Sequence, residues 1–462
     1  MNNAFKVISY SILSALISAN MAFAQNAPAS KAPEEKAGIA AEKSASKNDK
    51  TEKNKKAEAP EKKGTKYSFE ERVRVENFSY PLFDKKRTGK KNYVQSRFRL
   101  KAEETFSEES KLTLTFQDCR YFERAPESDA SISKNDFILY NAFLEVRNFA
   151  GIKGLFAKLG RQEVTFGNLR LFGNSNWGEG LVWDGARLIY KAKSGSFNLI
   201  NFESRRNDLM PPVQIRGLYY VCDRVKGMEV YALEYVDRNR VAGEIAKTVR
   251  KNIDINTFGV NYTKKFNKKV EANVETAFQS GDWGPEKHRA SAFHAEAKYN
   301  TLNKSNYSII VEYNEAAGDK NPLDGEHGTF CNLFPANHGK YGYMDYISWQ
   351  NMKEIALRNE LDIRKDLKAK LNYHRFRLQN AKDAWYRSNK SVFDSRRDAA
   401  GLSGTDIGSE IDLVLTKKLK ANLEIEAGIS KFKAGDFVKN TAKAGAETTD
   451  PSWGYIQVLK RW

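Results

Sequence analysis

The chain has 462 residues, with 76 Lys or Arg against 58 Asp or Glu, so its formal net charge is +18. This excess favours an anionic partner such as nucleic acid, acidic lipid or acidic sugar. Basic residues are spread along the whole chain and alternate with acidic ones, which argues against a compact nucleic-acid-binding module.

Residues 1–24 have the pattern of a secretory signal peptide. Lys6 precedes an apolar run from Val7 to Ala19, and Ala22-Phe23-Ala24 forms a small-x-small cleavage signature. Polar residues dilute the run, so a transmembrane anchor is the weaker interpretation. No later run of 18 apolar residues occurs, and any further membrane spans would therefore be strands.

Residues 25–66 are rich in Lys, Glu, Ala and Pro and almost free of large apolar side chains. Such a segment cannot bury enough surface to offset its ordering entropy. We expect a disordered tether here, with a helix as the less favoured alternative.

The organised part is predicted from Tyr67 to Trp462, and its hydrophobic period is two. In the first segment Val73 and Val75 alternate with Arg72 and Arg74. Between Tyr67 and Trp462 there are roughly 16 to 18 such segments in all, each of about 9 to 12 residues, with turns of alternating short and long length. The pattern predicts an all-β protein: a single transmembrane antiparallel β-barrel of about 18 strands, with its apolar face in lipid and its polar face in a wet lumen. A soluble β-sandwich is the alternative.

One stretch, NMKEIALRNELDIRKDL from Asn351, has the composition of a helix. However, Ile355, Leu357, Leu361 and Ile363 share one parity, which favours a strand.

The last residues, WGYIQVLKRW, resemble the closing strand of outer-membrane proteins, which ends on an aromatic residue. This resemblance implies that the outer-membrane assembly machinery recognises the strand that ends at Trp462.

A more specific resemblance lies in LGRQEVTFGNLRLFGNSNWGEGLVWDGARLIY, which is similar to a motif of the alginate export family of outer-membrane barrels. The motif positions here are Gly160, Arg161, Gln162, Gly167, Arg170, Asp184, Gly185 and Arg187. AGDKNPLDGEHGTFCNLFPANHGKYGYMD and LNYHRFRLQNAKDAWYRS resemble later blocks of the same family, in the same order. The resemblance implies an outer-membrane barrel whose cationic pore passes anionic polysaccharides or sugar acids.

Arginine keeps its charge at any working pH and its fork fits carboxylates, so arginines on the polar parity suggest a path for anions. The predicted lumen arginines are Arg97, Arg99, Arg161, Arg187, Arg205, Arg358, Arg375 and Arg377, and the predicted interleaved acids are Glu145, Glu203, Glu271 and Glu410. The acids would hold the arginines and prevent tight binding of the solute. A structural charge ladder without selectivity is the alternative.

Two motif residues are interpreted differently. Arg170 follows Gly167 and could cap a turn carbonyl, whereas Asp184 before Gly185 is expected to fix a bend or bulge.

Enzymatic and metal motifs are not found in the sequence. The five histidines lack zinc spacing, and the chain has neither a dinucleotide fingerprint nor a phosphate loop nor a nucleophile elbow. We therefore predict a channel that is not an enzyme and has no cofactor or metal, with outer-membrane lipid and an anionic saccharide as partners. A general small-solute porin and a secreted polysaccharide-degrading enzyme are the alternatives.

Overall fold

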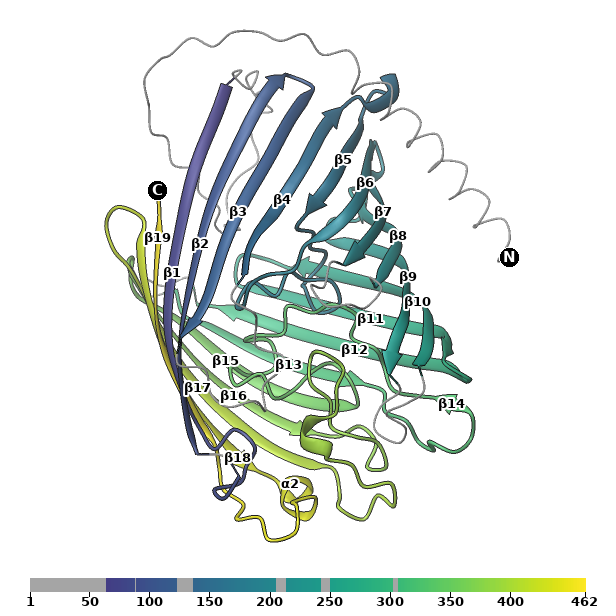
Figure 1. Ribbon diagram of the computed structural model, residues 1–462, viewed down its shortest axis with the longest axis vertical. Coiled ribbons are helices and arrows are strands. Elements are labelled where there is room, and N and C mark those ends of the chain that lie inside the picture. The colour runs from purple at the N-terminus through teal and green to yellow at the C-terminus, as the bar shows by residue number, and fades with distance from the viewer. Residues whose placement is uncertain (1–63, 88, 123–135, 205–212, 242–249, 302–305) are drawn as a thin grey trace. The chain divides into compact units, whose positions relative to one another are not determined.

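The computed structural model describes residues 64–87, 89–122, 136–204, 213–241, 250–301 and 306–462 (Figure 1). The strands are β1 Gly64–Ser79, β2 Lys90–Ser107, β3 Ser110–Phe122, β4 Asp136–Arg147, β5 Leu155–Gln162, β6 Trp183–Ala192, β7 Gly195–Ser204, β8 Gln214–Cys222, β9 Met228–Val241, β10 Arg250–Lys265, β11 Val270–Trp283, β12 Glu286–Asn300, β13 Ser308–Ala316, β14 Glu326–His327, β15 Met352–Arg364, β16 Leu367–Arg377, β17 Asp406–Lys418, β18 Leu423–Ala434 and β19 Ser452–Arg461. The helical turns are η1 Phe149–Gly151, η2 Phe393–Ser395 and α2 Asp436–Asn440.

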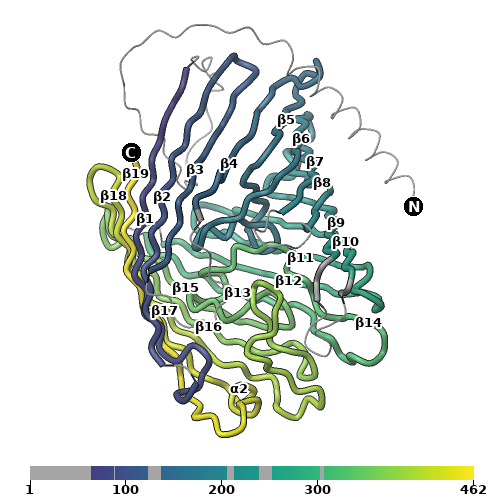
Figure 2. The backbone as a smooth tube through the Cα atoms, viewed as in Figure 1, coloured from purple at the N-terminus to yellow at the C-terminus, as the bar shows by residue number. Residues whose placement is uncertain are grey.

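The strands form one closed antiparallel barrel. Each long strand pairs with the next one along the chain, and β1 closes the ring by pairing with β19 from Glu70↔Arg461 to Ser79↔Ser452. These two strands, far apart in sequence, lie side by side in Figure 2. The two-residue β14 is an extra parallel pairing on β12, so the barrel itself has 18 strands. The predicted fold class is confirmed.

Loop length distinguishes the two ends of the barrel. Two-residue turns join β2 to β3 and β15 to β16 at the end where β19 finishes, whereas the opposite end carries loops 163–182, 317–351 and 378–405. Outer-membrane barrels have short periplasmic turns and longer extracellular loops. We therefore assign the long-loop end to the extracellular side.

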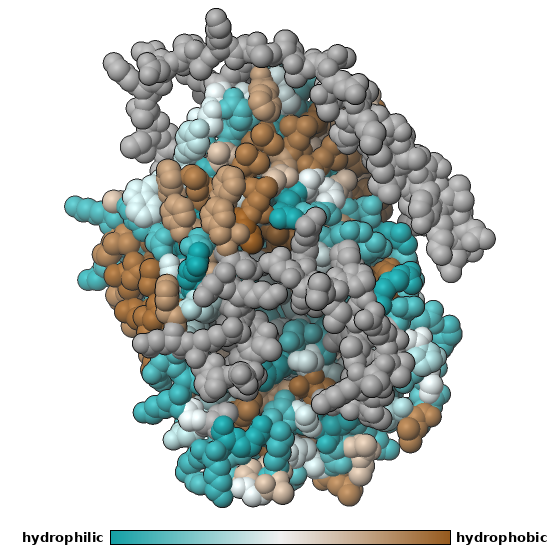
Figure 3. All heavy atoms as spheres, viewed as in Figure 1, coloured by the Kyte–Doolittle hydropathy of each residue, from teal (hydrophilic) through white to brown (hydrophobic). Residues whose placement is uncertain are grey.

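The outward face of the strands is apolar and exposed. Ile355 is 60% exposed and Ile429 is 64% exposed, whereas Glu354 and Ser430, beside them in sequence, point inward and are buried. In Figure 3, hydrophobic side chains gather beside β18 and β19, and the end that carries α2 is mainly hydrophilic. A soluble sandwich would bury these apolar faces against one another. In this barrel the apolar faces stay exposed and are available for contact with lipid.

The buried apolar core lies inside the barrel. Loop residues build it, with Phe172, Phe334, Tyr341, Trp349 and Trp385 packed against inward side chains of the wall. The long loops therefore fold into the lumen, where their aromatic side chains are buried and shielded from water.

Several boundaries can be compared with the sequence. β1 begins at Gly64, slightly before the predicted start at Tyr67, and the stretch with helical composition is the strand β15. The predicted signal peptide and residues 25–63 lie outside the described residues. Among the described residues, no helix is long and apolar enough to cross a membrane.

Candidate functional site: the two walls of the lumen

One side of the lumen is lined by four arginines, here called the arginine wall: Arg72 and Arg74 on β1, and Arg97 and Arg99 on β2. They share the inward parity, because Val73 and Phe98 between them are exposed. Alternation along two paired strands places all four guanidinium groups on one patch of the wall.

The arginine wall holds the crossing loop, residues 163–182, by its backbone. Arg72 donates to the carbonyls of Asn176 at 2.8 Å and Gly178 at 2.9 Å, and Arg74 donates to Trp177 O at 2.8 Å. Arg97 donates to the carbonyls of Asn176 and Gly178 at 2.9 and 3.0 Å. Carbonyl oxygens satisfy the donors but carry no net charge. The positive charge of the wall is therefore only partly compensated.

Two carboxylates provide that partial compensation. Glu70 accepts from Arg97 at 2.8 Å, and Glu76 accepts from Arg74 at 2.5 Å. Arg99 instead donates to the amide oxygens of Gln117 and Asn176 and lies over the ring of Tyr140.

The crossing loop also reaches the opposite side of the barrel. Arg170 pairs with Glu312 on β13, and Asn168 donates to the side-chain oxygen of Asn273 on β11 at 3.3 Å. Burial alone would lower the pKa of the Arg170 guanidinium, but Glu312, Tyr341 and Glu354 together outweigh burial and raise it. One loop is therefore anchored to both walls and narrows the lumen between them.

The crossing loop is fixed by the loop of residues 317–351, here called the long loop. Gly173 N donates to Phe334 O at 2.7 Å, and Phe334 N donates to Leu171 O at 2.9 Å, which makes a short parallel bridge. The indole of Trp183 packs edge-on against Phe334, with ring centroids 4.5 Å apart. The two loops therefore form one packed unit inside the barrel.

A second wall of the lumen, on β12 to β17, is rich in carboxylates. We call it the carboxylate wall, and its residues are His294, Glu296, Glu312, Asn314, Glu354, Arg358, His374, Glu410 and Asp412 on β12 to β17. Glu354 accepts from His374 Nδ1 and from Asn314 Nδ2, each at 2.6 Å. Glu410 accepts the backbone N–H of Met344 in the long loop at 2.9 Å. Most of these groups are buried, and they are satisfied mainly by one another and by the loops.

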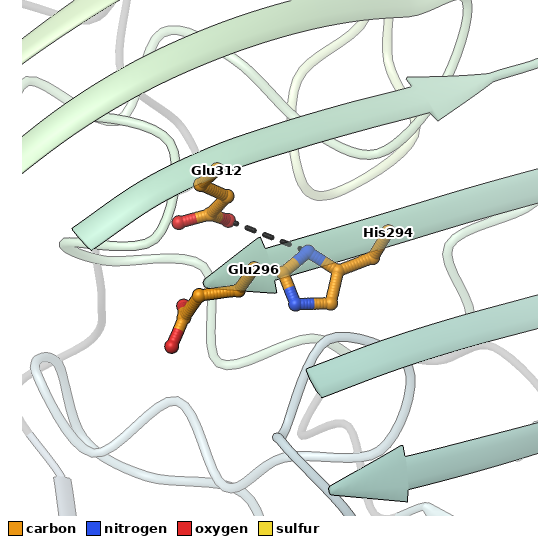
Figure 4. Close-up of side chains that lie close together, drawn as sticks. All are labelled: His294, Glu296 and Glu312. Atoms are coloured by element: carbon orange, nitrogen blue, oxygen red, sulfur yellow. Dashed lines mark ion pairs between the residues drawn. The ribbon is translucent and has the colours of Figure 1, made fainter. Parts of the chain in front are cut away.

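His294, Glu296 and Glu312 converge on this wall, with one ligand atom from each inside 4.8 Å of the others (Figure 4). Such a trio could hold a metal ion. However, the guanidinium of Arg358 pairs with both glutamates, and Arg170 pairs with Glu312. Two guanidinium groups already provide the positive charge that the carboxylates need, so the trio functions as part of an ion-pair network.

Seven of the predicted lumen residues lie on the inward parity of their strands: Arg97, Arg99, Arg187, Arg358, Glu145, Glu271 and Glu410. Arg187 donates to the amide oxygen of Asn198 at 2.6 Å and lies over the ring of Phe166. The part that these residues play for a solute stays a prediction.

Four predicted lumen residues lie on the outward parity, which corrects their placement: Arg161, Arg375, Arg377 and Glu203. Arg375, for example, lies between His374 and Phe376, which are buried inside, and pairs with Asp406 at 2.7 Å. Charge in a strand predicts a polar environment, but near a strand end the outward face meets polar headgroups and also tolerates charge. Arg205 lies outside the described residues.

Three glycines and a glutamine of the family motif lie in tightly packed surroundings. A Cβ on Gly160 would lie 2.3 Å from Ala142 O, and one on Gly185 would lie 2.1 Å from Asn201 O, so only glycine fits these close strand contacts. Gln162 is buried and donates to Lys158 O at 3.1 Å. A Cβ on Gly167 would lie 2.9 Å from the hydroxyl of Tyr219.

Three other motif residues, Arg161, Asp184 and Arg170, form ion pairs. Asp184 makes a two-pronged ion pair with Arg161, at 2.7 and 2.9 Å, on the outward face. Arg170 pairs with Glu312 instead of capping a turn carbonyl.

Sequence reasoning missed several residues of the site. Arg72 and Arg74 stand on the polar parity of the first strand, so the alternation already marked them. Lys340 gave no such signal, because it lies in a loop that folds back into the lumen. Arg170 and Arg358 stand near its amine, and burial together with these like charges lowers the pKa of Lys340 to about 8.

Comparison with known proteins decides the family. A model of the alginate export family matches residues 65–449. The chain belongs to this family. No curated protein matches the chain.

Solved structures share the fold at low sequence identity, and all three examples are from Pseudomonas aeruginosa. OccK11 (OpdR) is 13% identical with a TM-score of 0.54 and covers 86% of this chain and 95% of its own. OccK2 (OpdF), solved in complex with glucuronate, is 12% identical with a TM-score of 0.55, covering 86% and 97%. The outer membrane protein OprD is 12% identical with a TM-score of 0.52, covering 87% and 94%. Family and barrel together identify an outer-membrane channel for solutes, not an enzyme.

Proposed function

We propose that this alginate export family channel passes anionic saccharides of the uronate type, which move along the arginine wall and Arg187. The observation that carries the proposal is the bonding of Arg99 and Arg187. Both are half-buried inward guanidinium groups, and among the described residues neither forms an ion pair with a carboxylate. Their hydrogen bonds go to neutral oxygens, so each retains attraction for a passing carboxylate.

The balance of charges supports passage rather than capture. Glu70 and Glu76 moderate the arginine wall, and the carboxylate wall lines another part of the same lumen. A conducting pore needs sites that are favourable enough to enter but weak enough to leave. Solved OccK2 holds glucuronate, and a uronate of this kind is the solute class that guanidinium forks fit.

The test is planar-bilayer conductance of the purified, folded protein across a KCl gradient. We expect a zero-current potential that favours chloride, and a shift toward zero in the double variant Arg99→Gln with Arg187→Gln. The matched control is Arg161→Gln, an arginine of the same barrel that faces outward. A wild-type channel that prefers potassium, or a double variant that keeps wild-type selectivity, would falsify the proposal.

Block by oligouronates separates the sugar proposal from its alternative. We expect them to reduce the current at concentrations where a neutral oligosaccharide of equal length does not. Anion selectivity without such block would identify a general small-solute porin instead.

We also propose that the assembly machinery recognises the C-terminal strand. β19 ends beside Trp462, whose side chain is 54% exposed, and Lys460 lies over its ring. Deletion of Trp462 should lower the amount of folded barrel in the outer membrane while refolding into detergent stays intact.

A further inference from the structure

A group of basic side chains lies on the outward face of the barrel at its long-loop end. We call it the basic rim, and its residues are Lys353 on β15, Arg375 and Arg377 on β16, and Lys431 and Lys433 on β18. They share the outward parity of Ile355, Ile411 and Ile429, which are exposed a few residues nearer the middle of the barrel. The basic rim therefore lies directly beyond the part of the surface that faces hydrocarbon.

The carboxylates on this part of the rim are too few to neutralise it. Glu315 pairs with Lys353 at 3.3 Å and Asp406 pairs with Arg375 at 2.7 Å. Among the described residues, no carboxylate pairs with Arg377 or Lys433, and Lys431 donates to the backbone oxygen of Asp450. Five basic groups thus face two acidic partners.

The opposite part of the same rim, on β5 to β11, has the reverse balance. Its outward side chains include Arg161, Arg216 and Arg238 against Asp184, Glu203, Glu234, Asp254 and Asp282. Arg161 pairs with Asp184 and Arg216 with Glu234. The positive excess of β15 to β18 is therefore not found on β5 to β11.

The pairing register also concentrates the like charges. Lys353 stands directly opposite Arg377, and Ser409 on β17 is flanked by Arg375 on one side and Lys433 on the other. Like charges directly opposite on one sheet face destabilise the pairing. An anion bound between them would remove this cost.

We propose that the basic rim binds the phosphate groups of a lipid in the outer leaflet of the outer membrane. The rim stands at headgroup depth above an apolar face, so an acyl chain can lie on Ile355 and Ile411 while its phosphate meets the arginines. Arginine presents a fork that matches phosphate oxygens, and clustered Lys and Arg at a membrane surface recognise anionic headgroups. A soluble anion would gain nothing from the neighbouring apolar surface.

Titration of the full-length protein in neutral detergent with diphosphorylated lipid A tests the proposal, with native mass spectrometry as the readout. We expect the double variant Arg377→Gln with Lys433→Gln to bind about 25-fold more weakly, and the pair Lys353→Gln with Lys431→Gln to lose affinity similarly. The matched control is Arg238→Gln, an exposed basic residue of the opposite rim. It should bind like the wild type.

Three results would overturn the proposal. They are equal lipid binding by both double variants and the wild type, equal binding of the dephosphorylated lipid, and competition by inorganic pyrophosphate as strong as by lipid A. The last result would assign the rim to soluble phosphates. Unchanged single-channel conductance of each variant verifies that its barrel is folded.

Discussion

The two walls of the lumen satisfy their charges in different ways. The arginines on β1 and β2 donate mainly to backbone carbonyls of the crossing loop, whereas the acids on β12 to β17 pair with Arg170, Arg358 and histidines. A carbonyl satisfies a donor without cancelling its charge, but an ion pair cancels it. The arginine wall therefore keeps a positive field in the lumen, whereas on the carboxylate wall Arg170 and Arg358 cancel the charges of Glu296 and Glu312.

This difference separates two tasks. The ion pair of Arg170 with Glu312 holds the crossing loop to the carboxylate wall, because a buried partner is costly to lose. The loop in turn presents its carbonyls to the arginines and narrows the space in front of them. The anchor is on the carboxylate wall, and the solute path that we propose follows the arginine wall.

The largest expected effect comes from breaking the anchor. Glu312→Gln leaves Arg170 and Arg358 facing a neutral amide in a buried position. We expect the free energy of unfolding to fall by about 3 kcal/mol or more, the usual result of removing one partner of a buried pair. Urea titration of the detergent-folded protein, followed by tryptophan fluorescence, measures it.

Glu203→Gln is the matched control, because Glu203 is exposed on the outward face of β7. It should change stability by less than about 1 kcal/mol. Equal losses in the two variants would contradict the assignment of the anchor to the carboxylate wall.

A second prediction tests whether the bridge to the long loop holds the crossing loop in place. A Cβ on Gly173 would lie 2.5 Å from Ala336 N, at the bridge between the two loops, so Gly173→Ala should cost about 2 kcal/mol through overpacking. In Gly178→Ala the nearest atom would be 3.9 Å away, and little change is expected. Loop opening should appear as faster proteolysis of the crossing loop in the first variant only. Equal proteolysis of both variants would show that the bridge does not hold the loop.

Much of the barrel could be predicted from sequence, because alternate residues of each strand face lipid and lumen and are apolar and polar accordingly. Val73 and Val75 against Arg72 and Arg74 predict both the strand and its faces, and parity correctly resolved β15 despite its helical composition. The lumen loops could not be predicted in this way. Their contacts, such as Phe172 with Phe334, join segments far apart in sequence and have no period.

The site was predicted less well for the same reason. Parity correctly predicts that Arg97 and Arg358 point inward, provided that the inward parity of each strand is known. A charged residue near a strand end can instead face the lipid headgroups. The prediction that Arg375 and Arg161 line the lumen rests only on their being arginines in strands, whereas their neighbours His374 and Gln162 have the inward parity. Charge identifies a polar environment, and only register identifies which one.

Lys340 offers a pH test of the electrostatic asymmetry. With its pKa lowered to about 8, its charge falls from about nine-tenths at pH 7 to about one-tenth at pH 9. Because the lost charge is positive, preference for anions should decline over this range. Zero-current potentials at both pH values measure it, and Lys340→Gln should remove most of the change. A preference that rises with pH, or a change that persists fully in the variant, would contradict the prediction.

The smallest expected effect belongs to Arg161, although the family motif contains it. Its pair with Asp184 is outward and partly exposed, with side-chain exposures of 23% and 31%. Pairs of this kind contribute at most about 1 kcal/mol. Arg161→Gln should therefore lower stability slightly and leave the zero-current potential unchanged, whereas Arg187→Gln, on the inward parity of the neighbouring strand, should shift it. A shift in the first variant that equals the second would mean that outward charge at the strand ends also sets selectivity, and the contrast between the two walls would no longer explain the channel.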